Sequence, residues 1–483
     1  MKKIFTLVTA SVVSMTVMAT NYTGTLTVNN ATTQTGVTAT IEDNTVTLNG
    51  VTVADCAVNT VKGITTLVNK TAAAQVVAHY GYDSAYAVIN MTLADGTTYY
   101  FENVDKSFQL PNSDFETWTA SSGEPQYWHG FKSAYGGLAS MAKSTFVKDT
   151  NTRPGSTGSY SGLISSSEVN LGIAKIVANG TMTNGQLKAN SATATNTDNH
   201  SEMDRTSTRT DKDGNPFYMK LPARPDSIKV WVKFSQGTAN KNYPYATFNA
   251  VAFDDTSIAG KTYYQDPEDK EYTNVVARAS NNTIAVCNWT ELSIPFVYNH
   301  TTDANKNADA ILVTMSTNAT PGKGSKGDQI FIDDLTLVYK AEVTSVTYKG
   351  QQLSFTDGTC DLGTATEAPV ADDFAVAYNG ASASAGCTVV ETEDSYIAYV
   401  YAVSGDLLTT DVYTVVMHKA EETIPGDVND DKTVDIADIN AVVKIILNQE
   451  KDEKYISRSD LNGDKTIDIV DINAIINIIL NKK

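Results

Sequence analysis

Histidine, cysteine and tryptophan are scarce in this sequence, with five, four and four residues among 483. The histidines are scattered along the chain, and neither they nor the cysteines show the close spacing of a zinc site. No cysteine stands in a pattern typical of a thiol nucleophile. These scarcities argue against a Cys–His metal site and against a catalytic thiol.

Basic residues are also fewer than acidic residues. Lys and Arg number 36 against 55 Asp and Glu, which gives a formal net charge of −19 at pH 7. Nucleic acids and anionic membrane surfaces both need Lys and Arg to neutralise them, so this balance argues against either partner. Hard cations bind oxygen ligands and are favoured by the same balance. The length predicts three or four domains, and abundant Thr, Asn, Ser and Tyr are typical of secreted β-proteins.

A long apolar run occurs only at the N-terminus. Lys2 and Lys3 precede the apolar residues 4–18, and Val17-Met18-Ala19 fits the small-x-small cleavage pattern. We therefore expect residues 1–19 to be a signal peptide and the protein to be secreted, either extracellular or held at a cell surface by a partner. No later stretch is long and apolar enough to suggest a transmembrane segment.

Residues 21–107 show short alternating runs joined by turns. Tyr22, Leu26 and Val28 share one parity, and Asp95-Gly96 is a strong hairpin signal. The segment resembles the calycin-like β-barrel domain found ahead of other modules in secreted bacterial proteins. That resemblance implies a small β-barrel; because the segment is short for a closed barrel, an open, Ig-like sandwich is the alternative.

Residues 108–340 open with "PNSDFETW" and "GEPQYWHGF" and close with "GDQIFIDDLTLVYK". Between them, "RPDSIKVWVKF" and "NWTELSIPFVYN" alternate with the period of a strand. These motifs resemble the carbohydrate metabolism domain of polysaccharide-degrading bacteria and, more broadly, jelly-roll carbohydrate-binding modules. The resemblance implies a jelly-roll β-sandwich. The polar residues 190–213 predict a long loop on its rim.

Residues 341–420 contain further alternating strands and predict an Ig-like β-sandwich, and residues 421–426 predict a linker. Cys360 and Cys387 both lie in this segment. In an oxidising compartment they could form a disulfide, and two free buried thiols are the alternative. The spacing does not decide between the two.

The C-terminal residues 427–483 contain a duplicated acidic pattern followed each time by an apolar stripe with helical spacing. In each copy, oxygen-bearing residues occupy positions 1, 3, 5, 7, 9 and 12 of a loop, as a calcium ion requires. The expected ligands are Asp427, Asn429, Asp431, Thr433, Asp435 and Asp438 in the first loop and Asp460, Asn462, Asp464, Thr466, Asp468 and Asp471 in the second. Two calcium ions are therefore predicted.

These loops differ from ordinary EF-hands at two positions. Position 12 is Asp rather than Glu, and position 6 is Lys432 or Lys465 rather than Gly, so a positive φ is expected at a lysine. A loop followed by a helix, twice, with Asp at position 12, resembles the dockerin module. The resemblance implies calcium-dependent binding to a cohesin domain of another protein. Positions 10 and 11, which contribute to partner choice in that family, are Ile436-Ala437 and Ile469-Val470 instead of the common Ser-Thr pair.

The jelly-roll resemblance also implies one structural calcium, held by Glu116 of the early "FE" motif and Asp333 of the closing "DD" strand. Recognition of a sugar needs flat aromatic faces, and Tyr127, Trp128 and Trp231 are the candidate ligand-binding residues. Trp231 shares the polar face of its strand with lysines, while the alternate residues are apolar.

Two functions follow from these patterns. The first is a secreted modular protein that binds carbohydrate through the jelly roll and docks onto a cohesin-type partner. The second is a glycoside hydrolase acting on polysaccharide, for which no carboxylate pair stands out, so its catalytic residues are unknown. A non-catalytic surface adhesin or scaffold component is a further alternative.

Overall fold

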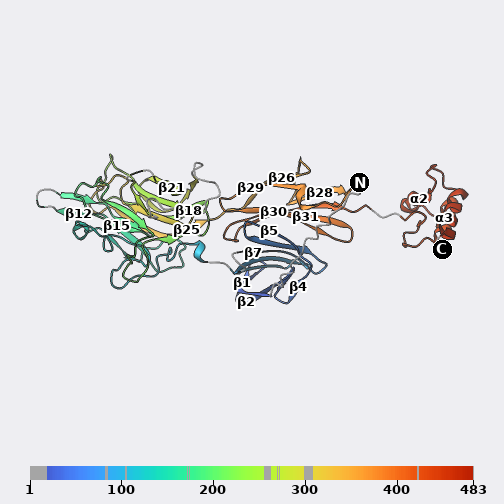
Figure 1. The fold of residues 1–483 in the computed structure, drawn as a ribbon, viewed down its shortest axis with the longest axis horizontal. Helices are drawn as coiled ribbons and strands as arrows, with labels where there is room; N and C mark the ends of the chain where they lie inside the picture. Colours follow the sequence, from blue (N-terminus) through green and yellow to red (C-terminus); the bar gives the residue numbers. More distant parts are fainter. Residues whose placement is uncertain are drawn as a thin grey trace, which may run out of the picture. The chain divides into compact units, whose positions relative to one another are not determined.

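The computed structural model describes residues 19–81, 85–103, 106–170, 172, 175–254, 263–268, 270, 272–298, 308–420 and 424–481. The expected signal peptide, apart from Ala19, and part of the expected linker lie outside the described residues. The chain forms β-sheets up to about residue 418 and α-helices after residue 435 (Figure 1). The expected mainly β, multidomain fold with a small helical C-terminal segment is confirmed.

The chain divides into two compact units. The larger contains the residues up to Cys360 together with Pro369–Glu391 and Ile397–Val416. The smaller contains Asp361–Ala368, Thr392–Tyr396 and the residues from Met417 onward.

The N-terminal segment forms one antiparallel sheet. Its strands are β1 (Thr20–Val28), β2 (Thr32–Glu42), β3 (Thr45–Leu48), β4 (Val51–Val53), β5 (Ala57–Val61), β6 (Ile64–Lys70), β7 (Ala74–Gly81), β8 (Tyr86–Leu93) and β9 (Thr98–Asn103). They pair in the order β4-β3-β2-β1-β9-β8-β7-β6-β5. Leu26, Leu48, Leu67 and Phe101 come from widely separated strands but bury their side chains in a single core, which requires the sheet to curl. Within the described residues, β4 and β5 do not pair with each other.

The second face of this sheet is covered as well. Val68 of β6 and Val77 of β7 pack against Val390 of β30 (Ser384–Glu391) and Tyr399 of β31 (Ser395–Val403). Six of the seven residues of β6 are therefore buried, including Thr65, Thr66 and Asn69.

The central segment is a sandwich of two sheets. One sheet has the order β10-β11-β25-β18-β22 and the other β14-β24-β19-β21-β23, with β17 pairing with β24. The first sheet comprises β10 (Thr145–Asp149), β11 (Ser161–Ser165), β18 (Ser227–Ser235), β22 (Cys287–Pro295) and β25 (Gln329–Val338). The second comprises β14 (Thr181–Thr183), β17 (Met219–Lys220), β19 (Ala246–Phe253), β21 (Val275–Ile284), β23 (Val297–Tyr298) and β24 (Ala310–Ser316).

Alternation along the strands fills the core between these two sheets. Ile228, Val230 and Val232 of β18 are fully buried on the core side, as their spacing predicted. Phe248 of β19 and Met315 of β24 face them from the other sheet. The motif "RPDSIKVWVKF" forms β18, whereas "NWTELSIPFVYN" forms most of β22 in the same sheet and β23 in the other.

Two small sheets flank the sandwich. The hairpin of β12 (Ser167–Asn170) and β13 (Lys175–Ala178) is one of them. The other has the order β15-β16-β20 and consists of β15 (Gln186–Lys188), β16 (His200–Asp204) and β20 (Tyr263–Asp266). Residues 190–213 were expected to be loop throughout, but β16 lies within them.

The third segment has two sheets, with the orders β27-β26-β29 and β28-β32-β31-β30. Besides β30 and β31, its strands are β26 (Glu342–Tyr348), β27 (Gln351–Gln352), β28 (Thr359–Thr364), β29 (Phe374–Asn379) and β32 (Thr410–His418). All four cysteines of the chain are free thiols, so Cys360 and Cys387 are not bridged. Burial raises the pKa of the Cys387 thiol to about 12, which makes it unreactive at neutral pH.

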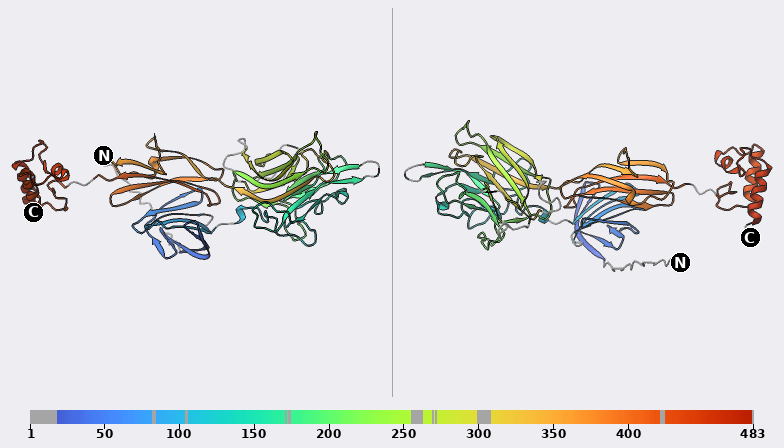
Figure 2. Two further views of the ribbon diagram at one scale, coloured as in Figure 1. Left: turned by 180° about the vertical axis from the view of Figure 1, so that it is seen from behind. Right: turned by 45° about the horizontal axis from the view of Figure 1, so that its top comes forward.

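The C-terminal segment contains α1 (Ile436–Ile446), α2 (Glu453–Ser459) and α3 (Ile469–Asn481) (Figure 2). The apolar stripes predicted on α1 and α3 meet: Val442 and Ile475 are fully buried in a shared core. Helix α2 was not predicted, and it precedes the second acidic loop.

Candidate functional site

A cavity of about 570 Å³ opens on the β14-β24-β19-β21-β23 sheet, on the face turned away from the sandwich core. Along β19, Phe248 and Ala250 point into the core, whereas Thr247 and Asn249 line the cavity. Small-molecule sites in proteins commonly measure about 300–1,000 Å³, so the cavity has the size of a ligand site.

The floor of the cavity is a row of hydroxyl and amide side chains from four strands. Thr247 lies opposite Ser316 and Asn249 opposite Thr314 in the pairing of β19 with β24. The floor residues are Thr181, Thr247, Asn249, Asn282, Thr314 and Ser316. Such groups can donate and accept hydrogen bonds without carrying charge.

The same sheet face is apolar at its other end. Val251 of β19 and Leu312 of β24 pack with Met203 of β16 and Tyr264 of β20 in a separate buried cluster. The small β15-β16-β20 sheet therefore covers one half of the face, and the polar half is left as the cavity.

One wall of the cavity consists of hydrocarbon side chains. The 3-10 helix η2 (Ala139–Met141) supplies Met141, and the β12–β13 hairpin supplies Val169, Ile176 and Val177. Phe131 is the one Phe, Tyr or Trp ring in the described lining. The cavity thus has a hydrogen-bonding floor and an aliphatic wall.

Two carboxylates from the end of β20 reach the cavity. Burial raises the pKa of Asp266 to about 6, against the opposing effects of the Thr314 hydroxyl and the Arg278 charge. Glu268 forms an ion pair with Arg278 and accepts a hydrogen bond from the Tyr264 hydroxyl at 3.2 Å. Asp266 is therefore a weak acid near neutral pH, beside a carboxylate held by a cation.

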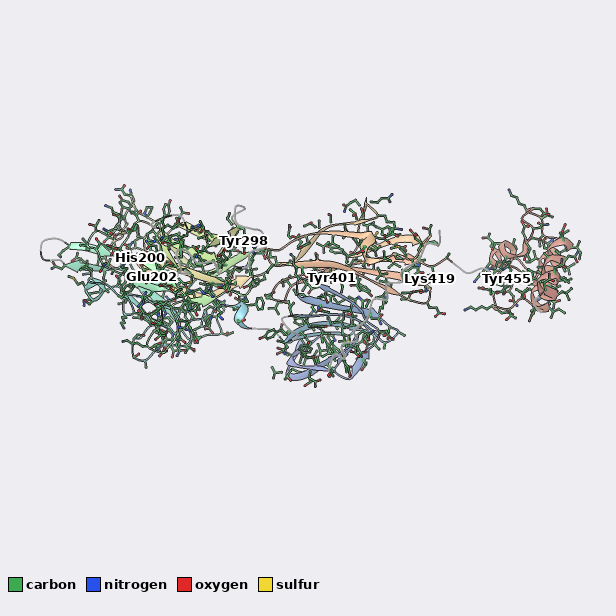
Figure 3. All side chains as sticks on the ribbon, viewed as in Figure 1. His200, Glu202, Tyr298, Tyr401, Lys419 and Tyr455 are labelled. Carbon is green, nitrogen blue, oxygen red and sulfur yellow. The ribbon has the colours of Figure 1, made fainter. Side chains whose placement is uncertain are left out.

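Behind the cavity, Glu202 of β16 is 4% exposed and bound by four side chains. It accepts from the Tyr135 hydroxyl at 2.7 Å and the Tyr263 hydroxyl at 3.1 Å, and it pairs with Arg209. It also contacts His200 Nε2 at 3.1 Å, and Figure 3 labels these two residues in the central segment. Burial alone would raise the pKa of Glu202, but the donors from His200, Tyr135 and Arg209 lower it to about 2. This buried carboxylate anchors the small sheet, and His200 in turn lines the cavity.

The expected sugar-binding residues do not line this cavity. Trp128 is 0% exposed, packs in the sandwich core and donates from Nε1 to the Pro111 carbonyl at 3.1 Å, so no face of its indole is open to a sugar. Tyr127 is partly buried against the same core. Trp231 lies on the outer face of the other sheet, as its parity predicted, and the Arg153 guanidinium lies over its ring at 5.3 Å.

The structure brings Glu116 and Asp333 to one loop, residues 151–160. Glu116 accepts from the amides of Ser159 and Tyr160 at 3.0 and 2.9 Å, and Asp333 accepts from the amide of Arg153 at 3.1 Å. Asp333 is 1% exposed, and burial raises its pKa to about 6. Within the described residues, no third His, Cys, Asp or Glu joins them to form a metal-binding group.

In the two acidic loops, the position-12 carboxylates Asp438 and Asp471 are completely buried. Asp438 accepts from the amides of Val428 and Asp435 at 2.7 and 2.9 Å, and Asp471 accepts from Leu461 and Asp468 at 2.9 Å each. Neither forms an ion pair with a Lys or Arg in the described part of the chain. A buried carboxylate without a cationic partner is costly, so these residues fit a bound cation.

The other predicted ligands surround these two carboxylates in matching positions. Asp427 accepts from the amides of Asp431 and Lys432 at 3.1 and 2.9 Å, and Asp460 makes the equivalent bonds with Asp464 and Lys465. Asn429 and Asp431 contact each other, as do Asn462 and Asp464, while Thr433 and Thr466 donate their amides to those aspartates. Asp435 and Asp468 cap the start of α1 and α3. The carboxylates bind loop amides here and do not gather into a three-residue ligand group within the described residues.

The lysines at position 6 adopt the expected backbone conformation. The φ angles are +65° at Lys432 and +68° at Lys465. Asp430, at position 4 of the first loop, pairs instead with Lys454 at 2.6 Å and with Arg458, both on α2. It is therefore directed to a helix rather than to the ligand shell.

The sequence of residues 425–480 matches the family described as Dockerin type I domain. The C-terminal segment is a dockerin type I domain. Such domains bind calcium, and their presence implies a cohesin partner. No curated protein matches the sequence as a whole. None of the described helices is of a length and apolarity that would let it cross a membrane.

Two solved structures resemble parts of the chain. One is the xylan-binding CBM22-2 domain of Paenibacillus barcinonensis Xyn10C, at 9% identity and a TM-score of 0.22, covering 48% of this chain and 99% of that one. The other is the enzymatically active domain of tailspike protein 4 of bacteriophage CBA120, at 10% identity and a TM-score of 0.20, covering 47% of this chain. The chain spans 21% of that tailspike structure. At these scores neither likeness carries a functional argument.

The Glu202 network yields a prediction for stability against pH. Glu202→Gln keeps the shape of the side chain but removes its charge. Because the folded pKa of about 2 lies below the ordinary value of 4.5, ionised Glu202 stabilises the fold above pH 4.5, and this stabilisation is lost as the pH falls toward 2. The shift corresponds to roughly 3 kcal/mol. We expect a lower Tm for the variant at pH 7 and a difference from wild type that shrinks below pH 4.5.

The matched control is Glu291→Gln. Glu291 pairs with Lys229 at 3.4 Å on an exposed face, where an ion pair contributes little. Its Tm should follow wild type at every pH. A constant difference between Glu202→Gln and wild type from pH 7 to pH 2.5 would show that the charge of Glu202 does not stabilise the fold.

Proposed function

We propose that this protein is secreted, binds carbohydrate in the cavity of its central β-sandwich and docks onto a cohesin domain through its dockerin. The observation that carries the carbohydrate assignment is the floor of six uncharged hydroxyl and amide side chains. Carbohydrates present many neutral hydroxyl groups, and a row of neutral donors and acceptors in a cavity complements them. The signal sequence at residues 1–19 supports export.

Carbohydrate binding would therefore use the central segment, residues 108–340. The segments 21–107 and 341–420 would act as accessory β-domains, and residues 427–483 as the docking module. Trp231 is a second candidate contact for a glycan, on the opposite sheet, if Arg153 moves from its ring.

We predict that Asn249→Leu weakens glycan binding about tenfold, because a ligand hydroxyl would then be buried without a partner. Binding of the full-length protein to a glycan array, followed by calorimetry on any glycan that binds, measures this. The control is Thr359→Val, an exposed position in the 341–420 segment that should leave affinity unchanged. Equal affinity of wild type and Asn249→Leu for every bound glycan would exclude this cavity as the site.

For calcium, we propose one ion in each dockerin loop and a further structural ion between Glu116 and Asp333. Titration calorimetry of the full-length protein should lose one calcium equivalent in Asp438→Asn and one in Asp471→Asn. Asp430→Asn, in the same loop but paired with α2, should keep both. Unchanged calcium stoichiometry in Asp438→Asn would contradict the ligand assignment. Loss of a separate equivalent in Asp333→Asn would indicate the ion in the sandwich.

Hydrolysis of the bound glycan is the second candidate function. Asp266 favours it, because a carboxyl with a pKa of about 6 in a ligand cavity can act as a general acid. Glu268 beside it, ion-paired with Arg278, would be the second carboxylate. If the protein is a hydrolase, incubation with a bound glycan releases shorter products, and Asp266→Asn lowers the rate by at least a hundredfold while binding persists. Absence of products from every bound glycan would leave binding alone.

A further inference from the structure

The aliphatic wall of the cavity has no role in the recognition of sugar hydroxyls. Val169, Ile176 and Val177 of the β12–β13 hairpin and Met141 of η2 face a floor that is polar along its whole length. Met141 is 36% exposed, and Ile176 and Val177 are partly exposed. Partly exposed aliphatic groups gathered in one cavity gain free energy when a ligand covers them.

Stacking of a sugar ring does not account for this wall. Stacking uses flat aromatic faces, and Phe131 is the one Phe, Tyr or Trp ring in the described lining. Branched and flexible aliphatic side chains instead surround small alkyl groups well, and the methionine thioether adapts to irregular shapes. The ligand that fills both sides of the cavity therefore carries hydroxyl groups along one edge and an alkyl group on the other.

The charged residues near the cavity indicate whether the group that carries this alkyl chain is itself charged. Lys188 lies within 3.7 Å of Asp198, and Glu268 is paired with Arg278, so the cations near the cavity already have anionic partners. Asp266 adds a group that is neutral below about pH 6. The lining therefore suits an uncharged substituent better than a carboxylate, sulfate or phosphate.

We propose that the cavity recognises an O-acylated saccharide, with the sugar hydroxyls on the floor and the acyl group against the wall formed by Met141, Val169, Ile176 and Val177. This inference rests on the proposed carbohydrate-binding function and specifies its ligand. An ester-linked acyl group is uncharged, ends in an alkyl group and leaves the neighbouring hydroxyls of the sugar free for the floor. Each methyl group buried against the wall tightens binding about fourfold.

The test compares esterified and de-esterified forms of the same polymers. Calorimetry of the full-length protein is performed with an O-acetylated xylan, an O-acetylated glucomannan and an O-acetylated pectin, each before and after mild alkaline removal of the acetyl groups. We expect at least one polymer to bind, and its binding to weaken fourfold or more after de-esterification.

Two variants locate the effect in the wall. In Met141→Gln/Ile176→Thr, the preference for the acetylated form should fall to less than twofold. The matched control is Val286→Thr, which alters an apolar residue that is 57% exposed outside the cavity and should keep the full preference. Thermal melts of all variants confirm that they are folded.

The possible failures are distinguishable. Equal affinity for both forms in the wild type would overturn this inference and leave the proposed function in place. A preference that persists in Met141→Gln/Ile176→Thr would also overturn it, because the acyl group would then lie elsewhere. Absence of binding to all six polymers would overturn both this inference and the carbohydrate assignment.

Discussion

Strands β19 and β24 place apolar side chains on the face toward the sandwich core and polar side chains on the face toward the cavity. The structure of the central segment depends on this difference. Phe248, Ala250 and Met315 fill the sandwich core on one face, which fixes the pairing of the two strands. A slip by one residue would bring these side chains out of the core and would cost several kcal/mol. The same register therefore aligns Thr247 with Ser316 and Asn249 with Thr314 on the other face. The polar floor is therefore aligned by the strand register that packing of the apolar core requires.

The cavity also needs a cover that closes only part of this face. The β15-β16-β20 sheet provides it, and Glu202 holds that sheet through donors from different parts of the chain. Burying a carboxylate is costly, and the cost is offset only when all its donors are in place. Glu202 therefore favours one placement of the cover, over Val251 and Leu312, and leaves the floor residues accessible.

A feature could be predicted from the sequence when the residues that form it lie close together in the chain. The ligands of each dockerin loop lie within twelve residues, and the alternation in β18 lies within nine, so both were visible as local patterns. Thr181, Asn249, Asn282 and Thr314 come from four strands, and only the sheet register brings them together. Polar residues at alternate positions of β19 and β24 were the one local signal of a second polar face. The aromatic cluster around Trp128 suggested a sugar-binding surface, but adjacent residues in a sequence do not show whether a side chain is buried, and Trp128 is.

Two features of the dockerin loops are energetically unfavourable, and contacts within the protein do not offset them. Lys432 and Lys465 hold positive φ angles, at about 1 kcal/mol or more each relative to ordinary backbone. Asp438 and Asp471 are completely buried and accept hydrogen bonds from backbone amides, which are neutral dipoles. A divalent cation bound in each loop would neutralise its buried carboxylate. The free energy of calcium binding would then offset both the backbone strain and the buried charge.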